Sequence, residues 1–375
     1  MKKIGLIVNP VAGIGGKVGL KGSDGIDTQR RARELGAVPE SDRKAELALR
    51  KLHESLEDAD SAEIYTWPGA MGGDIAKGFP FRTHVIGELG EGGTTASDTM
   101  DAAVALKAVG VDLILFAGGD GTARNILDAV GDGVPVLGIP AGCKIHSAVY
   151  AVNPRSAGEL VASFVEGRVR DTRESEVMDI DEELFREDRV DAKLYGYLRV
   201  PNAGQKVQNL KSGRGYSESG SIEFLSRCVA DSLEDDTLYI VGGGSTTKRI
   251  MGAVGLPDTL LGIDLFRNRK IVKNDAAERD ILGALGEYPK AKIIVTVIGG
   301  QGYLFGRGNQ QISAEVIKRV GRDNIIIAAS KDKMNSLFGQ PLYVDTGDDE
   351  VNASLTGYHK ILVGYDDYVV FKVAC

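Results

Sequence analysis

The chain has 375 residues, of which 43% are hydrophobic and 26% charged, and its formal net charge is −8. This length predicts two domains or one large domain, and this composition is typical of a globular protein. An acidic chain argues against nucleic acid as a partner, and the apolar runs are too short to cross a bilayer, so we expect no membrane partner either.

The cysteines and the N-terminus bear on the cellular compartment. Cys143, Cys228 and Cys375 are widely separated and odd in number, so they predict neither a disulfide framework nor a zinc site. The apolar segment that follows Met1-Lys2-Lys3 is too short for the core of a signal peptide. We therefore expect a cytoplasmic protein, and we also expect it to form a homo-oligomer.

Strands and helices alternate in the first half of the sequence. The expected strands are residues 3–8, 62–66, 83–86, 111–116 and 134–139. The expected helices are residues 43–57, 97–109 and 123–130, where apolar residues recur at helical spacing. This alternation predicts an α/β fold with a doubly wound, mostly parallel sheet and with ligand loops at the carboxyl ends of the strands.

The second half reads as mixed α/β and rich in strands. The expected strands are residues 193–200, 237–241, 260–264, 292–298, 324–328 and 342–345, with a terminal hairpin over 360–364 and 368–373. The expected helices are residues 275–285 and 313–320. The acidic segment 171–189 is either a domain junction or a solvated helix or loop.

These elements suggest three parts. We expect an N-terminal nucleotide-binding domain over residues 1–170, a second substrate domain over 171–358 with the site in the cleft between the two, and a hairpin over 359–375. A return of this hairpin to the first domain is an open alternative.

Glycine is over-represented, with 49 of 375 residues or about 13%, against a usual 7%. The glycines cluster at the ends of apolar segments, which indicates several loops shaped around a ligand.

The most informative of these clusters is Gly118-Gly119-Asp120-Gly121-Thr122, between an apolar strand and a helix. In a strand–glycine turn–helix, backbone N–H groups converge on a phosphate at the helix N-terminus. A carboxylate at such a place is repelled by phosphate unless it holds a metal or takes a proton from an attacking hydroxyl, so Asp120 indicates phosphoryl transfer.

A structural interpretation of the same residues is also open. Asp-Gly is a common turn dipeptide, and aspartate is a good N-cap for a following helix. The interpretation as a catalytic residue would be contradicted if the Asp120 side chain pointed inward and were held away from any open pocket.

With Asn9-Pro10 near its start, the chain resembles the superfamily of NAD kinases and of diacylglycerol and sphingoid lipid kinases. A closer resemblance is to a bacterial and archaeal branch described as ATP-NAD kinase-like, related to proteins encoded with acetoin catabolism. The matching segments are residues 9–25, 94–99, 116–124, 138–147, 242–247, 299–302, 306–311 and 345–348.

The resemblance implies a two-domain kinase in which ATP or polyphosphate donates to a hydroxyl, with Mg²⁺ required. In NAD kinases that hydroxyl is the adenosine ribose 2′-OH of NAD. Asp120 would then orient or deprotonate the acceptor. The residues expected to bind nucleotide or phosphate are Asn9, Gly118, Gly119, Gly121, Thr122, Arg124, Gly142, Lys144, Gly243, Gly244, Ser245 and Thr246. Further substrate or metal contacts are expected from His146, Gln301, Arg307 and Asp345.

Each of these side chains has a structural alternative. Arg124 can form bidentate hydrogen bonds to phosphate or be a surface arginine, and His146 can contact the acceptor or be a structural histidine. Arg307 can clamp the substrate or lie in a solvated loop. Asp345 and Asp348 can hold Mg²⁺ or cap the turn at Gly347.

The sequence departs from both kinase groups in one respect. NAD kinases carry an Asn-Glu or Asn-Asp pair between their two glycine loops, and lipid kinases usually carry Asn-Glu after the aspartate turn. This chain has no Asn-Glu, and its one Asn-Asp, Asn274-Asp275, follows the second loop. A kinase for another small-molecule or lipid-like alcohol, and a non-catalytic nucleotide sensor, therefore stay open as alternative functions.

Overall fold

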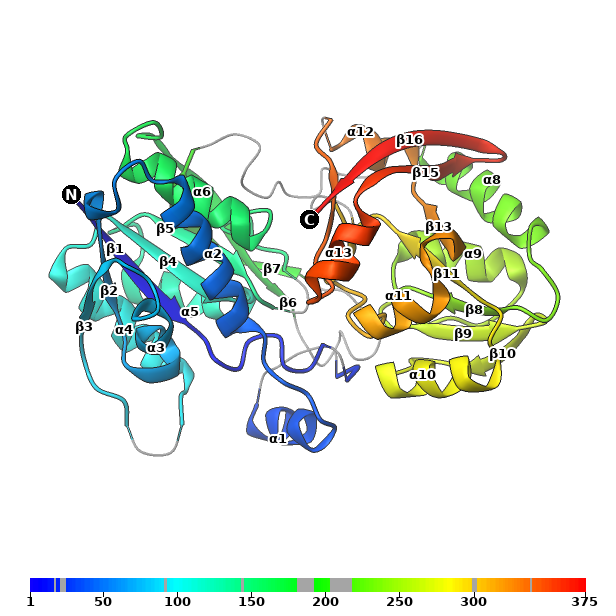
Figure 1. Ribbon diagram of the computed structural model, residues 1–375, viewed down its shortest axis with the longest axis horizontal. Helices are drawn as coiled ribbons and strands as arrows, with labels where there is room; N and C mark the ends of the chain where they lie inside the picture. The colour runs from blue at the N-terminus through cyan, green and yellow to red at the C-terminus, as the bar shows by residue number, and fades with distance from the viewer. Residues whose placement is uncertain are drawn as a thin grey trace. The chain divides into compact units, whose positions relative to one another are not determined.

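The computed structural model describes residues 1–16, 18–20, 25–90, 93–142, 145–180, 192–202, 218–298, 302–337 and 339–375 (Figure 1). Its contacts divide the chain into two compact units. The first comprises Met1–Ile14 and Gly22–Leu210, and the second comprises Gly15–Lys21 and Lys211–Cys375. The division falls later than the boundary expected after residue 170, and a short segment near the start belongs to the second unit.

The first unit contains a five-stranded sheet in which all neighbouring strands are parallel, as the sequence predicts. In spatial order the strands are β3 (Arg82–Val85), β2 (Ala62–Thr66), β1 (Lys2–Val8), β4 (Leu113–Gly118) and β5 (Val136–Pro140). The chain runs from β1 out to β3 and then returns to the other side of β1 with β4. The carboxyl ends of β1 and β4 thus form the topological switch point, where sheets of this type bind ligands.

Helices cover this sheet in pairs. The helix α2 (Ser41–Ser55) packs against α6 (Pro154–Val165), and α4 (Ala96–Val109) packs against α5 (Asp120–Val130). Figure 1 shows α2 and α6 side by side across the sheet. Every residue of β4 is buried, as expected for a strand covered on both faces. The short helices α1 (Ile26–Glu34) and α3 (Gly73–Ala76) complete the described helices of this unit.

The start of α6 has a clear local cause. Asn153 precedes the helix, and its side chain accepts a hydrogen bond from the backbone N–H of Ser156 at 2.7 Å. Pro154 follows, at a position where its missing N–H costs no intrahelical bond.

A two-stranded antiparallel ribbon follows, formed by β6 (Thr172–Ile180) and β7 (Ala192–Pro201). The strand β6 packs against α5, and β7 packs against β5. The interpretation of 171–189 as a junction or a solvated helix or loop is therefore wrong for 172–180, and residues 181–189 lie outside the described residues. Buried Ser175, Val177 and Asp179 recur at the spacing of two that defines a strand, which the high charge of the segment concealed.

The second unit contains a nine-stranded mixed sheet, as the strand-rich second half predicts. In spatial order its strands are β10 (Lys270–Lys273), β9 (Asp264–Arg267), β8 (Leu238–Val241), β11 (Ala291–Thr296), β13 (Ile325–Ala328), β15 (Gly357–Gly364), β16 (Asp367–Ala374), β14 (Leu342–Val344) and β12 (Tyr303–Phe305). The terminal hairpin β15–β16 pairs with β13 and β14, so it belongs to this sheet and does not return to the first.

Two hydrophobic clusters lie on opposite faces of the second sheet. Along β11, Ile293 and Val295 belong to one cluster and Ile294 to the other, because successive strand residues face opposite ways. One cluster packs under α8 (Glu218–Asp231) and α9 (Ser245–Val254). The other packs under α10 (Glu278–Glu287), α11 (Ala314–Val320) and α13 (Asp349–Leu355), and α12 (Lys331–Asn335) is a further short helix.

Among the element boundaries that differ from the sequence prediction are the starts of β9, α10 and α5. The strand expected over 260–264 begins only at Asp264, because the preceding residues form a turn in which Gly262 lies against Asp275. The helix expected from 275 begins at Glu278, since Asp275 has a left-handed φ of 50°. The helix expected from 123 begins at Asp120, which places this residue in the first turn of α5.

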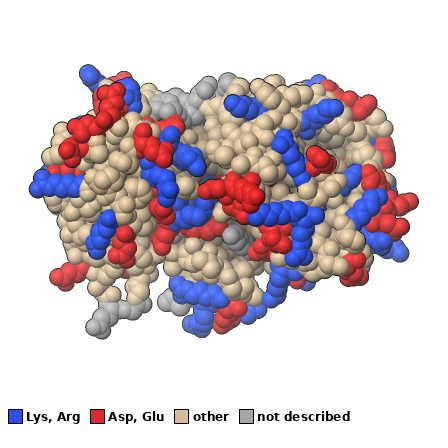
Figure 2. All heavy atoms as spheres, in the orientation of Figure 1, with Lys and Arg blue, Asp and Glu red and all other residues tan. Residues whose placement is uncertain are grey.

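Two surface properties can be read directly. Within the described ranges, no helix combines the length and the apolar composition that a bilayer crossing requires. On the face shown in Figure 2, Lys and Arg side chains are interspersed with Asp and Glu, so this face carries no broad basic surface.

Candidate active site

Three loops of the first unit meet at the carboxyl edge of the parallel sheet. Asn9 follows β1, Gly118 ends β4 and Gly119 follows it, and Gly142 lies in the loop after β5. Backbone bonds join the loops: the N–H of Asn9 donates to Ala117 O at 2.9 Å, and the N–H of Gly142 donates to Gly118 O at 3.0 Å. The structure thus brings the predicted residues from three separate parts of the sequence to the switch point.

Asn9 links the first of these loops to α5. Its amide Nδ2 donates to Thr122 Oγ1 at 3.0 Å, and its Oδ1 accepts from the Val11 N–H at 3.2 Å. Thr122 is buried. Two of the residues predicted to bind nucleotide are therefore in direct contact, and both also hold the loops together.

The glycines of the turn are required by close packing of the chain on itself. A Cβ added at Gly118 would lie 2.4 Å from the Thr122 side chain, and one at Gly142 would lie 2.8 Å from Gly119 Cα. On the first loop, a Cβ on Gly13 would lie 2.2 Å from the Ala141 carbonyl oxygen. The sequence interpretation attributed these glycines to room for a phosphate, whereas the structure gives each of them a packing reason as well.

The Asp120 side chain is enclosed, with only 4% of it exposed. Its Oδ1 accepts from Ser147 N at 3.0 Å and from Ser147 Oγ at 2.7 Å. Its Oδ2 accepts from His146 N at 2.7 Å and lies 3.2 Å from His146 Nδ1. The carboxylate therefore fastens the loop after β5 to the first turn of α5.

This enclosure bears on the role expected for Asp120. Both of its oxygens already accept bonds from protein donors, so the carboxylate is not open to an alcohol as the sequence interpretation supposed. In the cluster formed by Asp120, His146 and Ser147, the partly exposed member is His146, with 24% of its side chain accessible. Ser147 is buried, and its Oγ accepts from the Met178 N–H at 3.0 Å, which ties the cluster to β6.

Arg124 contacts the β6–β7 ribbon. Its Nη1 lies 2.9 Å from Asp179 Oδ2, and its guanidinium carbon lies 5.3 Å from the centre of the Tyr195 ring. Asp179 is largely buried, so this ion pair fixes α5 to the ribbon. A phosphate contact by Arg124 would have to compete with this ion pair.

The second predicted glycine loop begins α9 in the second unit. Gly243 and Gly244 precede the helix, and Ser245 is its first residue. A Cβ on Gly243 would lie 2.9 Å from the backbone of Leu261, so this loop is also tightly packed. Thr246 is fully buried in the first turn of the helix.

A lysine that the sequence interpretation missed meets this loop. Lys333 of α12 donates to Thr246 Oγ1 at 3.1 Å and to Thr296 Oγ1 at 3.3 Å. Its ammonium group thus lies beside the first turn of α9. No local sequence signal marks Lys333, because its partners come from the start of α9 and the end of β11, which are distant in the sequence.

The loop around Arg307 lies in the interior of the second unit. Arg307 is 2% exposed, and its guanidinium carbon lies 5.3 Å from the centre of the Tyr303 ring. A Cβ on Gly306 would lie 1.8 Å from Asp345 O, so this loop and the end of β14 are in direct contact. Burial of Arg307 rules out a solvated loop at this position. Burial also raises the pKa of Tyr303, while the positive charge of Arg307 opposes this change.

The same loop contacts a segment from near the start of the chain. The side chain of Gln310 lies against Gly16, where an added Cβ would be 1.8 Å from Gln310 Oε1. Gln310 and Gln311 are both buried, so this contact forms part of the second unit.

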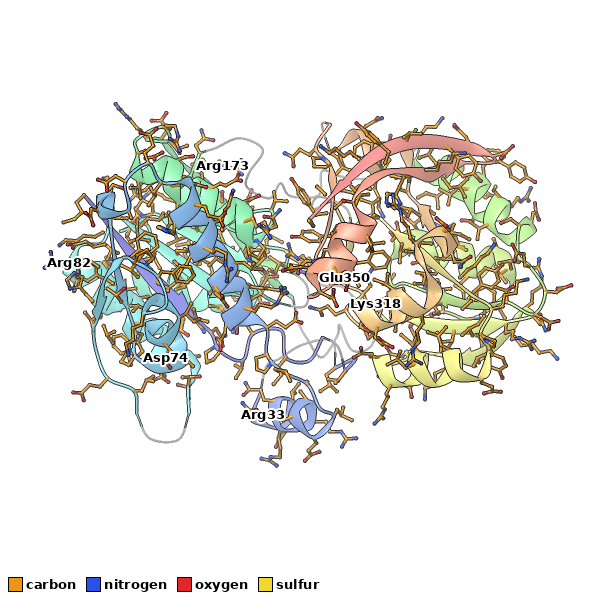
Figure 3. The ribbon with its side chains drawn as sticks, in the orientation of Figure 1. Arg33, Asp74, Arg82, Arg173, Lys318 and Glu350 are labelled. Atoms are coloured by element: carbon orange, nitrogen blue, oxygen red, sulfur yellow. The ribbon has the colours of Figure 1, made fainter. Side chains whose placement is uncertain are left out.

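Asp348 has a structural role. Its Oδ1 caps α13 by accepting from Val351 N at 3.0 Å, and its Oδ2 pairs with Lys318 Nζ at 2.8 Å. Lys318 also lies 4.0 Å from Glu350, and Figure 3 shows these two side chains beside each other on α11 and α13. The capping alternative therefore accounts for Asp348.

Two of the predicted site residues, Lys144 and Gln301, lie outside the described residues. Within the described part of the chain, no group of three or more His, Cys, Asp or Glu side chains has the arrangement of a metal site.

Two models of known protein domains match this chain. Residues 4–169 match the ATP-NAD kinase N-terminal domain, and residues 234–373 match the ATP-NAD kinase C-terminal domain. Together these matches cover most of the chain and fall one in each unit. The chain belongs to the ATP-NAD kinase family.

Solved structures give weaker likenesses. Two chains from Bacillus anthracis str. Sterne, one reported as a putative diacylglycerol kinase and the other as a diacylglycerol kinase, are 16% and 17% identical to this chain, with TM-scores of 0.23 and 0.22. The alignments cover 48% of this chain and 46% and 47% of those chains, so the chain spans about half the length of these structures. Among curated proteins, no match was found.

Proposed function

We propose that this protein is a phosphotransferase that moves a phosphoryl group from ATP or polyphosphate to a hydroxyl, and that this hydroxyl is the adenosine ribose 2′-OH of NAD. The observation that carries the proposal is the match to both ATP-NAD kinase domains, with the Gly118–Thr122 turn at the switch point of the first. Ligands of open parallel sheets bind at this position.

The first turn of α5 would contact the donor. The first N–H groups of a helix have no intrahelical partner, and a helix N-terminus favours negative charge. Gly119 precedes α5 without a capping side chain, which leaves these donors to a ligand. The contact between Asn9 and Thr122 would then hold the β1 loop beside the same phosphates.

The glycine loop before α9, in the second unit, resembles the glycine turn before α5 in composition. Its helix N-terminus, the buried Thr246 hydroxyl and the Lys333 ammonium group favour an anionic group such as a nucleotide phosphate. Gly243, Gly244 and Ser245 would contribute backbone N–H groups there.

Mg²⁺ is expected to accompany the donor. Mg²⁺ usually keeps several waters and is held by one or two carboxylates together with substrate phosphates. The described residues do not form a dedicated magnesium site, and both Asp120 oxygens already accept hydrogen bonds from N–H and O–H groups of the protein, which compete with coordination of a cation. We therefore propose that Mg²⁺ enters bound to the donor phosphates.

The test is conversion of NAD to NADP by the purified protein with ATP or polyphosphate. Asp120→Asn is expected to lower kcat about 100-fold or more, the usual scale for a group in the proton-transfer machinery. Retained turnover in this variant would remove Asp120 from the reaction.

A second candidate is a kinase for a different alcohol. It is favoured by the absence of an Asn-Glu pair from the sequence. A screen for ADP release across sugars, polyols and lipid-like alcohols distinguishes the two candidates, because one acceptor class will support turnover and the others will not. ATP-dependent thermal stabilisation with no transfer to any acceptor would instead indicate a nucleotide sensor.

A further inference from the structure

The cluster at the start of α5 places a buried carboxylate behind a partly exposed imidazole. Asp120 has 4% of its side chain exposed, whereas His146 has 24%, and the two lie 3.2 Å apart through Oδ2 and Nδ1. Asp120 is the first residue of α5, whereas His146 lies in the loop after β5.

The carboxylate has little capacity left for a substrate. Ser147 N and Ser147 Oγ occupy Oδ1, and His146 N occupies Oδ2 together with the imidazole. An acceptor alcohol could reach Asp120 only by displacing one of these donors from an enclosed site. An enclosed, hydrogen-bonded carboxylate of this kind orients a neighbour more readily than it receives a proton.

The same contact selects the imidazole tautomer. An ionised carboxylate only accepts hydrogen bonds, so the ring nitrogen that faces Asp120 carries the proton. Nε2 of the neutral ring then holds a free lone pair, which makes it the basic atom of the cluster.

We propose that His146 is the general base of the phosphoryl transfer and that Asp120 is its positioning residue. This proposal rests on the proposed function. The acceptor proton moves to His146 Nε2 as the acceptor oxygen bonds to the terminal phosphorus of a nucleoside triphosphate or polyphosphate. The bond from phosphorus to the bridging oxygen breaks, and its electron pair leaves with the nucleoside diphosphate or with the polyphosphate shortened by one unit. His146 then releases the proton to solvent.

Among the described residues, Asp120 of α5 is the charged group in contact with the His146 ring. Asp179 of β6 pairs with Arg124 of α5, so these two residues together add no net charge. The negative charge of Asp120 supports the imidazolium formed during transfer. Lys144 lies outside the described residues.

The first test separates the base from its positioning residue by kinetics. His146→Gln is expected to lower kcat about 100-fold while leaving the KM for the donor within about 3-fold, because only proton transfer is removed. His53→Gln, at an exposed position on α2, is the matched control and should keep wild-type turnover.

Rescue of activity by added imidazole distinguishes a catalytic role of His146 from a purely structural one. Imidazole added to His146→Gly should restore part of the turnover, whereas a purely structural histidine would not respond. If His146→Gln keeps its turnover while the wild type is active, the assignment of the base is overturned and the proposed function stands.

A second measurement does not depend on activity. The chain has 4 histidines, and ¹⁵N NMR of the imidazoles with single His→Gln variants assigns each ring. His146 is expected to carry its proton on Nδ1, and Asp120→Asn should reduce this preference. A proton on Nε2 in the wild type would overturn the proposal even before kinetics. If no donor and acceptor pair supports transfer by the wild type, the proposed function fails and the assignment of the base fails with it.

Discussion

Gly119 and Gly142 approach each other so closely that neither can carry a side chain while the loops stay in place. An added Cβ on Gly142 would lie 2.8 Å from Gly119 Cα, and one on Gly119 would lie 3.2 Å from Gly142 Cα. The obstructing atoms are backbone atoms, which cannot rotate away as a flexible side chain can. The two loops after β4 and β5 therefore depend on both glycines.

Gly142→Ala should consequently lower the free energy of unfolding by about 1–3 kcal/mol, the usual cost of overpacking. Turnover should also fall, because the loop that carries His146 begins beside this contact. Urea denaturation measures the first effect and the NAD kinase assay the second.

The matched control is Gly283→Ala. Gly283 lies within α10, where an added Cβ would have no neighbour within 4 Å. Alanine is a better helix former than glycine, so this variant should gain up to about 1 kcal/mol. A loss of stability in both variants, or in neither, would contradict the packing explanation for Gly142.

At the scale of single residues, the sequence predicted which loops lie at the switch point, but not the contacts that the Asp120 side chain makes. The glycine turn, the strand before it and the helix after it locate Asp120 from local pattern alone. Enclosure of the carboxylate depends on His146 and Ser147, which lie in another loop, and only the strand order brings them to it. Arg124 and Lys333 illustrate the same limit, since the partner of Arg124 comes from β6 and the partners of Lys333 come from α9 and β11.

Among the helices, α6 shows how one residue sets a boundary. Asn153 is 9% exposed and caps the helix through Ser156 N. Asn153→Ala should cost about 0.5–2 kcal/mol of unfolding free energy, because a buried helix N–H loses its partner. Asn153→Asp keeps an accepting oxygen and should lose less. Equal losses in the two variants, measured by urea denaturation, would contradict the capping role.

His359, near the start of β15, makes a pH-dependent contribution to the free energy of unfolding. His359 Nε2 lies 2.8 Å from Leu355 O. Burial lowers the pKa of His359, the contact with Leu355 opposes this, and the nearby positive charge of Arg322 lowers the pKa further. The unfolded chain therefore takes up the proton first as the pH falls.

The stability that this histidine contributes is accordingly complete above about pH 6.5, the ordinary value for histidine, and is lost as the pH falls through the lower folded value. His359→Gln should show a flatter dependence of the unfolding free energy between pH 7 and 5, measured by urea titrations. An unchanged slope in the variant would contradict this assignment.

The elements were predicted well where apolar runs are continuous and poorly where charge hides a pattern. The buried residues of β1 and β4 are all apolar or glycine. In β6 every second residue is buried between Ser175 and Asp179, but the charged residues of the strand made 172–180 resemble a junction. The start of α10 was misplaced because a left-handed residue, Asp275, interrupts the pattern.

For the molecule as a whole, the central fact is that each unit has its own hydrophobic core. The core of the first unit includes Trp67, the single tryptophan of the chain, whereas the clusters of the second unit contain none. Tryptophan emission therefore reports unfolding of the first unit alone, and far-UV circular dichroism reports both units.

We expect the two signals to give denaturation curves that do not coincide, because separate cores unfold as separate cooperative units. Gly142→Ala should move the tryptophan curve, whereas Gly283→Ala should leave it in place and change only the dichroism curve. Coincident curves in all three proteins would instead mean that the units unfold as one.

The segment Gly15–Lys21 belongs by its contacts to the second unit, although the residues before and after it belong to the first. Neither unit is thus one continuous stretch of sequence. A chimaera that exchanges the C-terminal halves of two relatives at a single crossover near residue 210 would join Gly16 of one parent to Gln310 of the other. Recombination that respects this architecture has to transfer both stretches together.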